Sequence, residues 1–208
     1  VNAPVRLSQS VRAADLHDAA EARRIEGFVR EQDAGLFHRP AWLLGVEAGT
    51  GQRARGFVAE RGGVMTGWLP LTEVRSILFG RALVSSGFAV GGGICASDGA
   101  AADALAEAAE RHAAERGIGA VELRGGTIPQ RPGWRQWDDR HCGFERPLAA
   151  DDDAELRAIP RKARAEVRKG LANELPVRVG RGREDLTAHY AAYSASVRNL
   201  GTPVFPRR

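Results

Sequence analysis

The residues with the clearest chemical potential form a short basic stretch in the last quarter of the chain. It holds both lysines of the sequence, and its cations are Arg161, Lys162, Arg164, Arg168 and Lys169. On a helix the three arginines fall at i, i+3 and i+7 and share one face, with the lysines beside them. Such a stripe suits the phosphates of a nucleic acid or of a phosphate-bearing precursor. A solvated helix face that binds nothing is an equally good interpretation.

The distribution of charge supports an anionic partner for this part of the chain. Residues 1–150 contain 18 arginines and 18 acidic residues, so they are neutral. Residues 151–208 contain 12 basic and 8 acidic residues, and 12 − 8 accounts for the whole net charge of +4. Arg198 and Arg207 extend the basic character toward the end of the chain, although Arg207 also fits an ordinary surface arginine.

Four further side chains are candidates for a cleft: His38, Trp42, Tyr190 and Glu122. His38 and Trp42 are i, i+4 neighbours on an expected helix, where Trp42 is interpreted as core and His38 is left open. Tyr190 lies on one helical stripe with Tyr193, and this spacing favours a buried stripe over contact with a ligand.

Glu122 follows the longest expected helix and is the best-placed carboxylate for acid–base work. An ion pair with Arg124 on the same strand face is the more common role for such a residue. No spacing in the chain supports a Ser/His/Asp or Cys/His set, so the catalytic residues stay unknown at this stage.

Metal binding and membrane spanning are not indicated. Cys95 and Cys142 are isolated, which fits a reduced, cytoplasmic setting. His141 and Cys142 are adjacent, so on a strand they point to opposite faces and cannot easily share a metal. No apolar run approaches the roughly 18 residues of a membrane span, and the first residues lack the apolar core of a signal peptide.

The expected elements combine to a mixed α/β architecture. Early helices are predicted over 14–30 and 37–46, a hairpin over 54–60 and 64–74 around Arg61-Gly62-Gly63, and a strand over 82–90 that ends in three glycines. A helix over 100–116 should pack its alanine-rich side on the sheet. The following strand, 120–124, implies a parallel pairing. Further strands at 141–148 and 177–179, and helices at 160–170 and 185–199, complete the prediction.

Several stretches carry a family resemblance. They include Leu36-Phe37-His38-Arg39-Pro40-Ala41-Trp42, Gly67-Trp68-Leu69-Pro70-Leu71, Val74-Arg75-Ser76-Ile77-Leu78-Phe79-Gly80-Arg81, Gly91-Gly92-Gly93, Val121-Glu122-Leu123-Arg124, and Val197-Arg198-Asn199-Leu200-Gly201-Thr202-Pro203-Val204-Phe205-Pro206. Together with the basic helix they resemble the Fem-like (FemAB family) acyltransferases, bacterial proteins with two domains of the GNAT type. The likeness is to the form associated with the exosortase/PEP-CTERM system.

This resemblance implies a function. Residues 1–150 would form a first GNAT-like domain, and 151–208 the start of a second, truncated one. The activity would be transfer of an aminoacyl or acyl group to an amine of a cell-envelope, exopolysaccharide or peptidoglycan-type precursor. The donor would be aminoacyl-tRNA or acyl-CoA, with no permanently bound cofactor. The precursor would be a nucleotide- or lipid-linked saccharide, and Arg207 would lie where the family contacts its phosphate.

Two departures from the family pattern affect the expected substrates. The position where related ligases often carry a phosphate-binding lysine is Val46, followed by Glu47. The loop before the long helix ends in Asp98, whose charge competes with an anion at that helix N-terminus. A non-catalytic binding module of the same fold, which recognises an anionic polymer or a partner protein, is therefore kept as the alternative.

Overall fold

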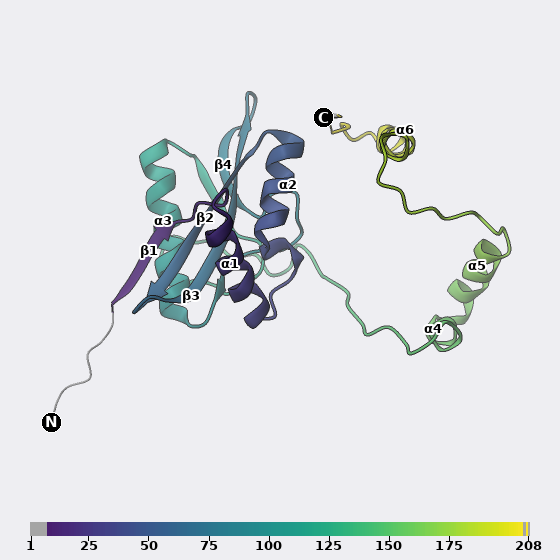
Figure 1. Ribbon diagram of the computed structural model, residues 1–208, viewed down its shortest axis with the longest axis horizontal. Coiled ribbons are helices and arrows are strands. Elements are labelled where there is room, and N and C mark those ends of the chain that lie inside the picture. The colour runs from purple at the N-terminus through teal and green to yellow at the C-terminus, as the bar shows by residue number, and fades with distance from the viewer. Residues whose placement is uncertain (1–7, 206, 208) are drawn as a thin grey trace. The chain divides into compact units, whose positions relative to one another are not determined.

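The computed structural model describes residues 8–205 and 207. The chain forms two compact units: one runs to Gly133 and also takes in Phe205, and the other covers Trp134–Val204. The two are described separately below (Figure 1). No described helix is long and apolar enough to cross a membrane.

The first unit is built on a six-stranded mixed sheet with the order β1-β2-β3-β4-β6, in which β5 also pairs with β3. All pairings are antiparallel except that of β4 with β6, which is parallel. This confirms the mixed sheet and the strand–helix–strand unit expected from the sequence. The strands are β1 (Gln9–Ala13), β2 (Arg53–Arg61), β3 (Val64–Ser76), β4 (Gly80–Ser85), β5 (Cys95–Ala96) and β6 (Ala120–Glu122).

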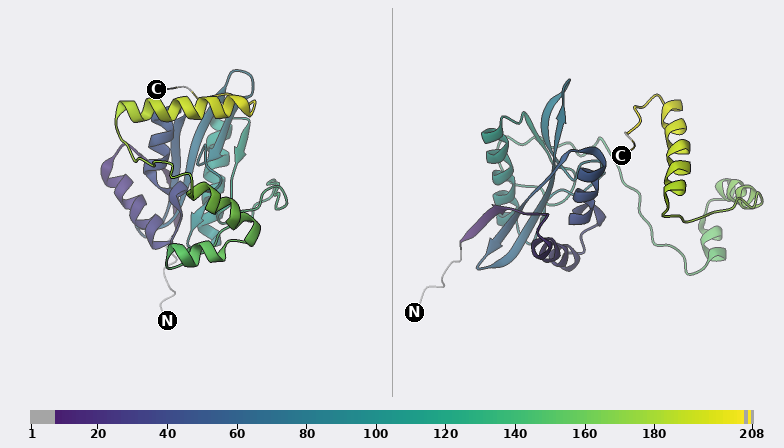
Figure 2. Two further views of the ribbon diagram at one scale, coloured as in Figure 1. Left: turned by 90° about the vertical axis from the view of Figure 1, so that its right-hand side faces the viewer. Right: turned by 45° about the horizontal axis from the view of Figure 1, so that its top comes forward.

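The sheet is covered by helices on both faces (Figure 2, right). Helix α3 packs against one face, and the pair α1 and α2 packs against the other. Asp18 caps α1 through the backbone N–H groups of the first turn, and Asp98 caps α3 in the same way; such caps define where a helix begins. The bounds are α1 (Ala19–Glu31), a 3₁₀ turn η1 (Leu36–His38), α2 (Pro40–Thr50) and α3 (Gly99–Arg116).

Successive side chains of β2 and β3 point to opposite faces of the sheet, so each face carries part of the core. Val58 and Trp68 are paired across the strands and belong to the core cluster beneath α1 and α2. On the opposite face Gly67 leaves room for the side chain of Leu105 on α3. The alanine-rich side of α3 is buried as predicted, including Ala101, Leu105, Ala108 and Ala109.

The second unit is helical among its described residues and has no buried helix position. Its helices are α4 (Asp152–Ala158), α5 (Arg161–Leu171) and α6 (Arg183–Asn199). The strands expected at 141–148 and 177–179 are wrong, because these segments find no partner strand in the described part of the chain and remain irregular. The assignment of 151–208 to a second domain of the same kind stays a prediction.

The buried tyrosine stripe on α6 is a second expectation that the structure corrects. Tyr190 and Tyr193 lie together, with ring centroids 6.0 Å apart. Both side chains are only half-buried, because the described residues of this unit place no element over the stripe.

Candidate active site

The central feature of the first unit is an interruption in the strand next to β3. β4 ends with Ser85 opposite Leu71, and β5 begins with Cys95 opposite Trp68. Residues 86–94 therefore loop out opposite the short stretch of β3 that contains Pro70. Proline has no N–H to donate to a ladder, and only its carbonyl oxygen is used here, by the backbone N–H of Ser86 at 3.2 Å. A proline within a strand predicts an irregularity or an edge position; β3 continues through Pro70, and the irregularity lies in the strand beside it.

The looped-out segment holds a strained backbone. Ser86 and Phe88 have φ of 41° and 63°, values that residues other than glycine seldom adopt. The strain is held by neighbours: the Ser86 hydroxyl donates to the carbonyl oxygen of Phe37, and the backbone N–H of Gly87 donates to Thr72 Oγ1 at 3.0 Å. Strained backbone of this kind concentrates at functional sites.

Glycine is required where this segment rejoins the sheet. Gly92 has φ of 92°, and a side chain there would meet Ser86. A Cβ on Gly93 would collide with the backbone of Gly125. Within the described part of the chain, no loop hydrogen bond uses the backbone N–H of Gly91, Gly92 or Gly93. The loop therefore carries three backbone donors that no described group uses; Gly91 is half-buried, and Gly92 and Gly93 are buried.

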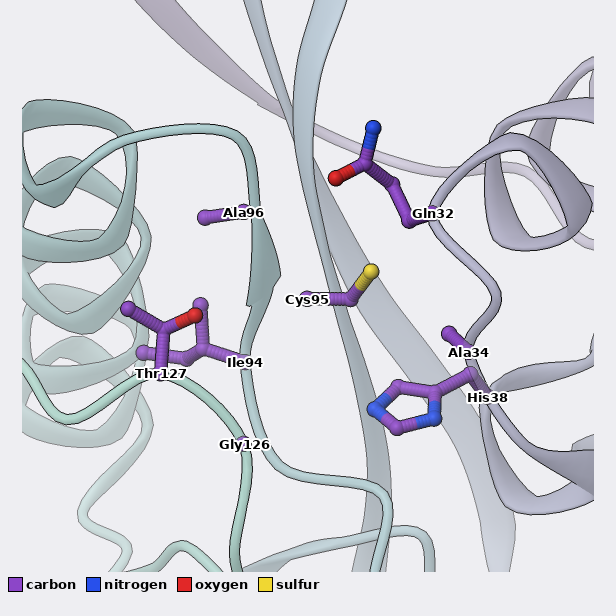
Figure 3. A pocket seen from close by; sticks show the side chains of 8 residues that line it. All are labelled: Gln32, Ala34, His38, Ile94, Cys95, Ala96, Gly126 and Thr127. Atoms are coloured by element: carbon purple, nitrogen blue, oxygen red, sulfur yellow. The ribbon is translucent and has the colours of Figure 1, made fainter.

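A cavity of about 280 Å³ adjoins this loop (Figure 3). Its walls come from the end of α1 and the turn that follows it, from β5, and from the loop after β6. The ring of His38 and the thiol of Cys95 extend into the space between these elements from opposite sides. The lining residues are Gln32, Ala34, His38, Ile94, Cys95, Ala96, Gly126 and Thr127.

His38 ties the turn before α2 to the glycine loop. Its Nε2 lies 3.2 Å from the carbonyl oxygen of Gly93. Because a carbonyl only accepts, the neutral ring carries its proton on Nε2 and leaves Nδ1 as the acceptor. Burial lowers the pKa of His38, against the opposing effect of the Gly93 and Gly35 backbone groups. His38 thus lines the cavity as a neutral imidazole that positions the loop.

Cys95 is unsuited to act as a nucleophile. Burial raises the pKa of its thiol to about 11, and it is the thiolate that attacks electrophiles. Among the described residues, no carboxylate lines the cavity, and no group of three or more metal-ligating side chains occurs. The chemistry that this site supports is therefore positioning and backbone hydrogen bonding.

The N-terminus of α3 is occupied by the protein's own carboxylate. Asp98 Oδ1 accepts from the backbone N–H of Ala101 at 2.9 Å, and Oδ2 is 2.9 Å from Arg61 Nη1. A helix N-terminus usually attracts anions, and here the attraction is already satisfied. The competition expected from Asp98 is thus visible as a cap and an ion pair.

Of the sequence-predicted residues of the first unit, His38 lines the cavity, whereas Trp42 and Glu122 do not. Trp42 is half-buried and donates through Nε1 to the carbonyl oxygen of Gly87 at 3.3 Å, so it braces the strained loop. Glu122 is 55% exposed on its side chain and pairs with Arg124 at 2.7 Å. This pairing supports the structural interpretation of Glu122.

The basic side chains of α5 do not behave alike. Arg164 Nη2 donates to the carbonyl oxygens of Arg157 at 2.8 Å and Ile159 at 2.9 Å, so it closes the turn between α4 and α5. Four other cations of the helix are exposed and form no ion pair among the described residues; they are Arg161, Lys162, Arg168 and Lys169. Arg198 lies in the last turn of α6, and Arg207 lies outside the helices.

His38 was expected at a cleft and lines the cavity, but sequence reasoning missed the other lining residues and the part that the glycine loop plays. The run of three glycines was the available signal, since it marks close backbone approach. The pairing of His38 with Gly93 joins positions 55 residues apart, a contact that no local pattern reveals.

Comparisons with known proteins give structural similarities only. No family model matches the chain, and no curated protein matches it. Among solved structures, a ribosomal-protein-alanine N-acetyltransferase from Brucella melitensis biovar Abortus 2308 is 15% identical; the match covers 66% of this chain and 99% of that one, with a TM-score of 0.44. A GCN5-related N-acetyltransferase from Ralstonia eutropha JMP134 is 21% identical over 68% and 99%, with a TM-score of 0.40.

A third similar structure is a predicted acetyltransferase with acetyl-CoA from Clostridium acetobutylicum. It is 11% identical to this chain, and the match covers 66% of this chain and 96% of that one, with a TM-score of 0.41.

Proposed function

We propose that the first unit is an N-acyltransferase domain of the GNAT type, which transfers an acyl or aminoacyl group to an amine. The observation that carries this proposal is the interrupted strand between β4 and β5. There a strained loop with free backbone N–H groups adjoins a cavity of about 280 Å³. Acyl transfer requires donors aimed at the oxygen that becomes negative, and backbone N–H groups supply such stabilisation.

The reaction consists of attack by the amine nitrogen on the carbonyl carbon of a thioester or ester. A C–N bond forms, the C–S or C–O bond breaks, the amine loses a proton, and the leaving thiol or hydroxyl gains one. The described cavity walls contain no carboxylate, and His38 Nε2 is engaged by Gly93. The amine therefore enters in its neutral form, and the domain contributes alignment of the reactants and stabilisation of the oxyanion.

The donor is proposed to be aminoacyl-tRNA, with acyl-CoA as the second candidate. The Asp98–Arg61 pair at the start of α3 weighs against a pyrophosphate at that helix. The four exposed cations of α5 support a partner that carries many phosphates. The acceptor is proposed to be an amine on a phosphate-linked envelope or exopolysaccharide precursor, as the family resemblance implies.

Binding of inert donor analogues tests the location of this site. The probes are a thioether analogue of acetyl-CoA and a tRNA acceptor-stem mimic that carries an amide-linked alanine. Backbone amide resonances should shift at Gly91, Gly92, Gly93 and Thr127 with one of the two probes. Shifts confined to α5, with none around the cavity, would favour the non-catalytic module that recognises an anionic polymer.

A further inference from the structure

The tip of the β3–β4 hairpin is the most exposed apolar segment of the first unit. The residues Ile77, Leu78 and Phe79 are 104%, 86% and 90% exposed. The hairpin projects beyond the body of the sheet in both views that show it from the side (Figures 1 and 2). Three consecutive apolar residues held in water are costly and indicate an interaction site.

Hydrogen bonds hold the tip of the hairpin in a defined conformation. Ser76 Oγ accepts from the backbone N–H groups of Leu78 at 3.3 Å and Phe79 at 3.2 Å, which fixes the turn. Gln52 brackets the base: its Oε1 accepts from the backbone N–H of Arg75 at 2.8 Å, and its Nε2 donates to the Arg75 carbonyl oxygen at 3.3 Å. The apolar tip is therefore presented in a fixed position.

A collar of arginines surrounds the base of the tip. Arg75 and Arg81 face each other across the strands, and both pair with the buried Glu73. Arg53 is opposite Glu73 on β2, and Arg81 Nη1 reaches the carbonyl oxygen of Arg116 at the end of α3 at 2.8 Å.

The collar is positive on balance. These four arginines, joined by Arg55, which also pairs with Glu73, outnumber the nearby carboxylates. These are Glu73, the exposed Glu115 of the last turn of α3, and Glu47, whose Oε1 accepts from the backbone N–H of Ala54 at 3.2 Å. The net positive charge of this collar attracts an anionic surface.

We propose that this hairpin docks the protein on an anionic lipid bilayer, with Ile77, Leu78 and Phe79 inserted and the arginines among the headgroups. Leu78 lies three residues beyond both Arg75 and Arg81, at the centre of the turn that follows the last strand pair Ser76 and Gly80, so it lies at most about 10 Å past the two arginines. Apolar side chains of interfacial proteins enter the headgroup boundary by about 5–10 Å. The arginine collar and the apolar tip therefore match the two layers of a membrane surface.

The shape of the surface favours lipid over protein. A specific protein interface covers about 800 Å² on each partner, and three side chains at a convex tip fall well short of that area. A fluid bilayer accommodates a narrow wedge without a complementary groove. The inference is independent of the proposed reaction, because vesicle binding is measured without any turnover.

Vesicle co-sedimentation of the whole chain tests the proposal. The probes are vesicles of phosphatidylcholine alone and of phosphatidylcholine mixed with phosphatidylglycerol. Wild type should bind the mixed vesicles, and a triple Ile77→Ser, Leu78→Ser, Phe79→Ser variant should bind at least about tenfold more weakly. The matched control replaces Leu175, Val177 and Val179 by Ser; these are 72%, 92% and 92% exposed and should leave binding unchanged.

A second measurement separates tip insertion from electrostatic binding by α5. In a Cys142→Ser background, Leu78→Cys carries an environment-sensitive fluorophore; Cys95 is buried and resists labelling. Emission should shift to the blue on mixed vesicles, while a probe at Val177→Cys should not. Arg53 and Arg116 form no described ion pair. Their joint replacement by Gln should weaken binding to the mixed vesicles about tenfold. Unchanged binding of the tip variant, or no shift at position 78, would overturn the proposal.

Discussion

Trp68 Nε1 donates a 2.8 Å hydrogen bond to the backbone carbonyl oxygen of His38. The indole is fully buried in β3, so this bond fixes the turn η1 against the centre of the sheet. The ring of the same His38 then holds the glycine loop through Gly93. β3, the turn η1 and the glycine loop next to the cavity are thus connected through one residue.

Replacement of Trp68 by Phe should lower the free energy of unfolding by about 2 kcal/mol, because a buried carbonyl loses its donor. Urea denaturation measures the effect. The matched control is Trp42→Phe: that indole is half-buried and its bond to Gly87 is 3.3 Å long, so the loss should stay below about 1 kcal/mol. Equal losses for the two variants would contradict the central role of the Trp68 bond.

Gly56 is paired with Pro70 across β2 and β3, and a Cβ there would collide with the ring of Trp68. Gly56→Ala should cost about 1–3 kcal/mol through overpacking. In the double variant with Trp68→Phe part of that cost should disappear, since the smaller ring relieves the clash. Strict additivity of the two changes would show that they do not act on one contact.

Glu73 should be the strongest electrostatic determinant of stability. Burial alone would raise its pKa, but Arg81 and Arg75 overcome this and lower it to about 2. Glu73→Gln leaves these arginines without their carboxylate and should cost about 3 kcal/mol at neutral pH. Glu107→Gln, at an exposed pair with Arg131, should cost within about 1 kcal/mol.

The sign of the pH effect follows from the lowered pKa. Glu73 binds its proton less readily in the folded state, so its stabilisation is complete above its ordinary value of 4.5 and is lost as pH falls toward about 2. The difference between wild type and Glu73→Gln should shrink over that window. A difference that stays constant down to pH of about 2 would count against the ion-pair account.

His38 should make stability fall at mildly acidic pH. Burial lowers the pKa of His38 below 6.5, so the unfolded chain binds the proton more readily. The stabilisation is complete above pH 6.5 and is lost as pH falls through the folded pKa. His38→Gln should flatten the slope of unfolding free energy against pH below 6.5. Burial also lowers the pKa of His112. The His38→Gln variant should therefore keep a smaller slope in the same direction.

The exposed cations of α5 should govern the salt dependence of tRNA binding. Replacement of Arg161, Lys162, Arg168 and Lys169 by Gln should reduce the slope of log affinity against log salt by about 0.7–0.9 for each phosphate that these side chains neutralise in the wild type. Arg164→Gln is the control, because this side chain is held by backbone carbonyls; it should loosen the α4–α5 turn and leave the slope unchanged. Identical slopes for all three proteins would identify α5 as a solvated face.

Local sequence signals predicted the framework of the first unit. The alanine-rich period of α3, the hairpin of β2 and β3, and the irregularity beside Pro70 each depend on local signals. Val177 and Val179 show the limit of such signals, because alternation forms a strand only where a partner strand exists.

The arrangement of the site could not be predicted from the sequence, because it depends on contacts between segments that are distant along the chain. His38 meets Gly93, and Glu73 meets Arg81, only because the sheet register brings them together. Likewise Arg164 belongs to the basic stripe by spacing, yet its guanidinium turns back to the carbonyls of the preceding turn. Periodicity gives the face of a helix, and the competing partners decide which side chains remain available.

Amide formation at the cavity is the direct test of the proposed function. The protein is incubated with alanyl-tRNA or acetyl-CoA and with UDP-glucosamine, which carries a primary amine and two phosphates, and products are identified by mass. One donor should yield the amide, and Ala34→Phe, which fills the cavity, should lower the rate at least about tenfold. Ala41→Phe, at an exposed position of α2, should leave it unchanged. Absence of amide with both donors, or equal rates for the two variants, would contradict acyl transfer at this site.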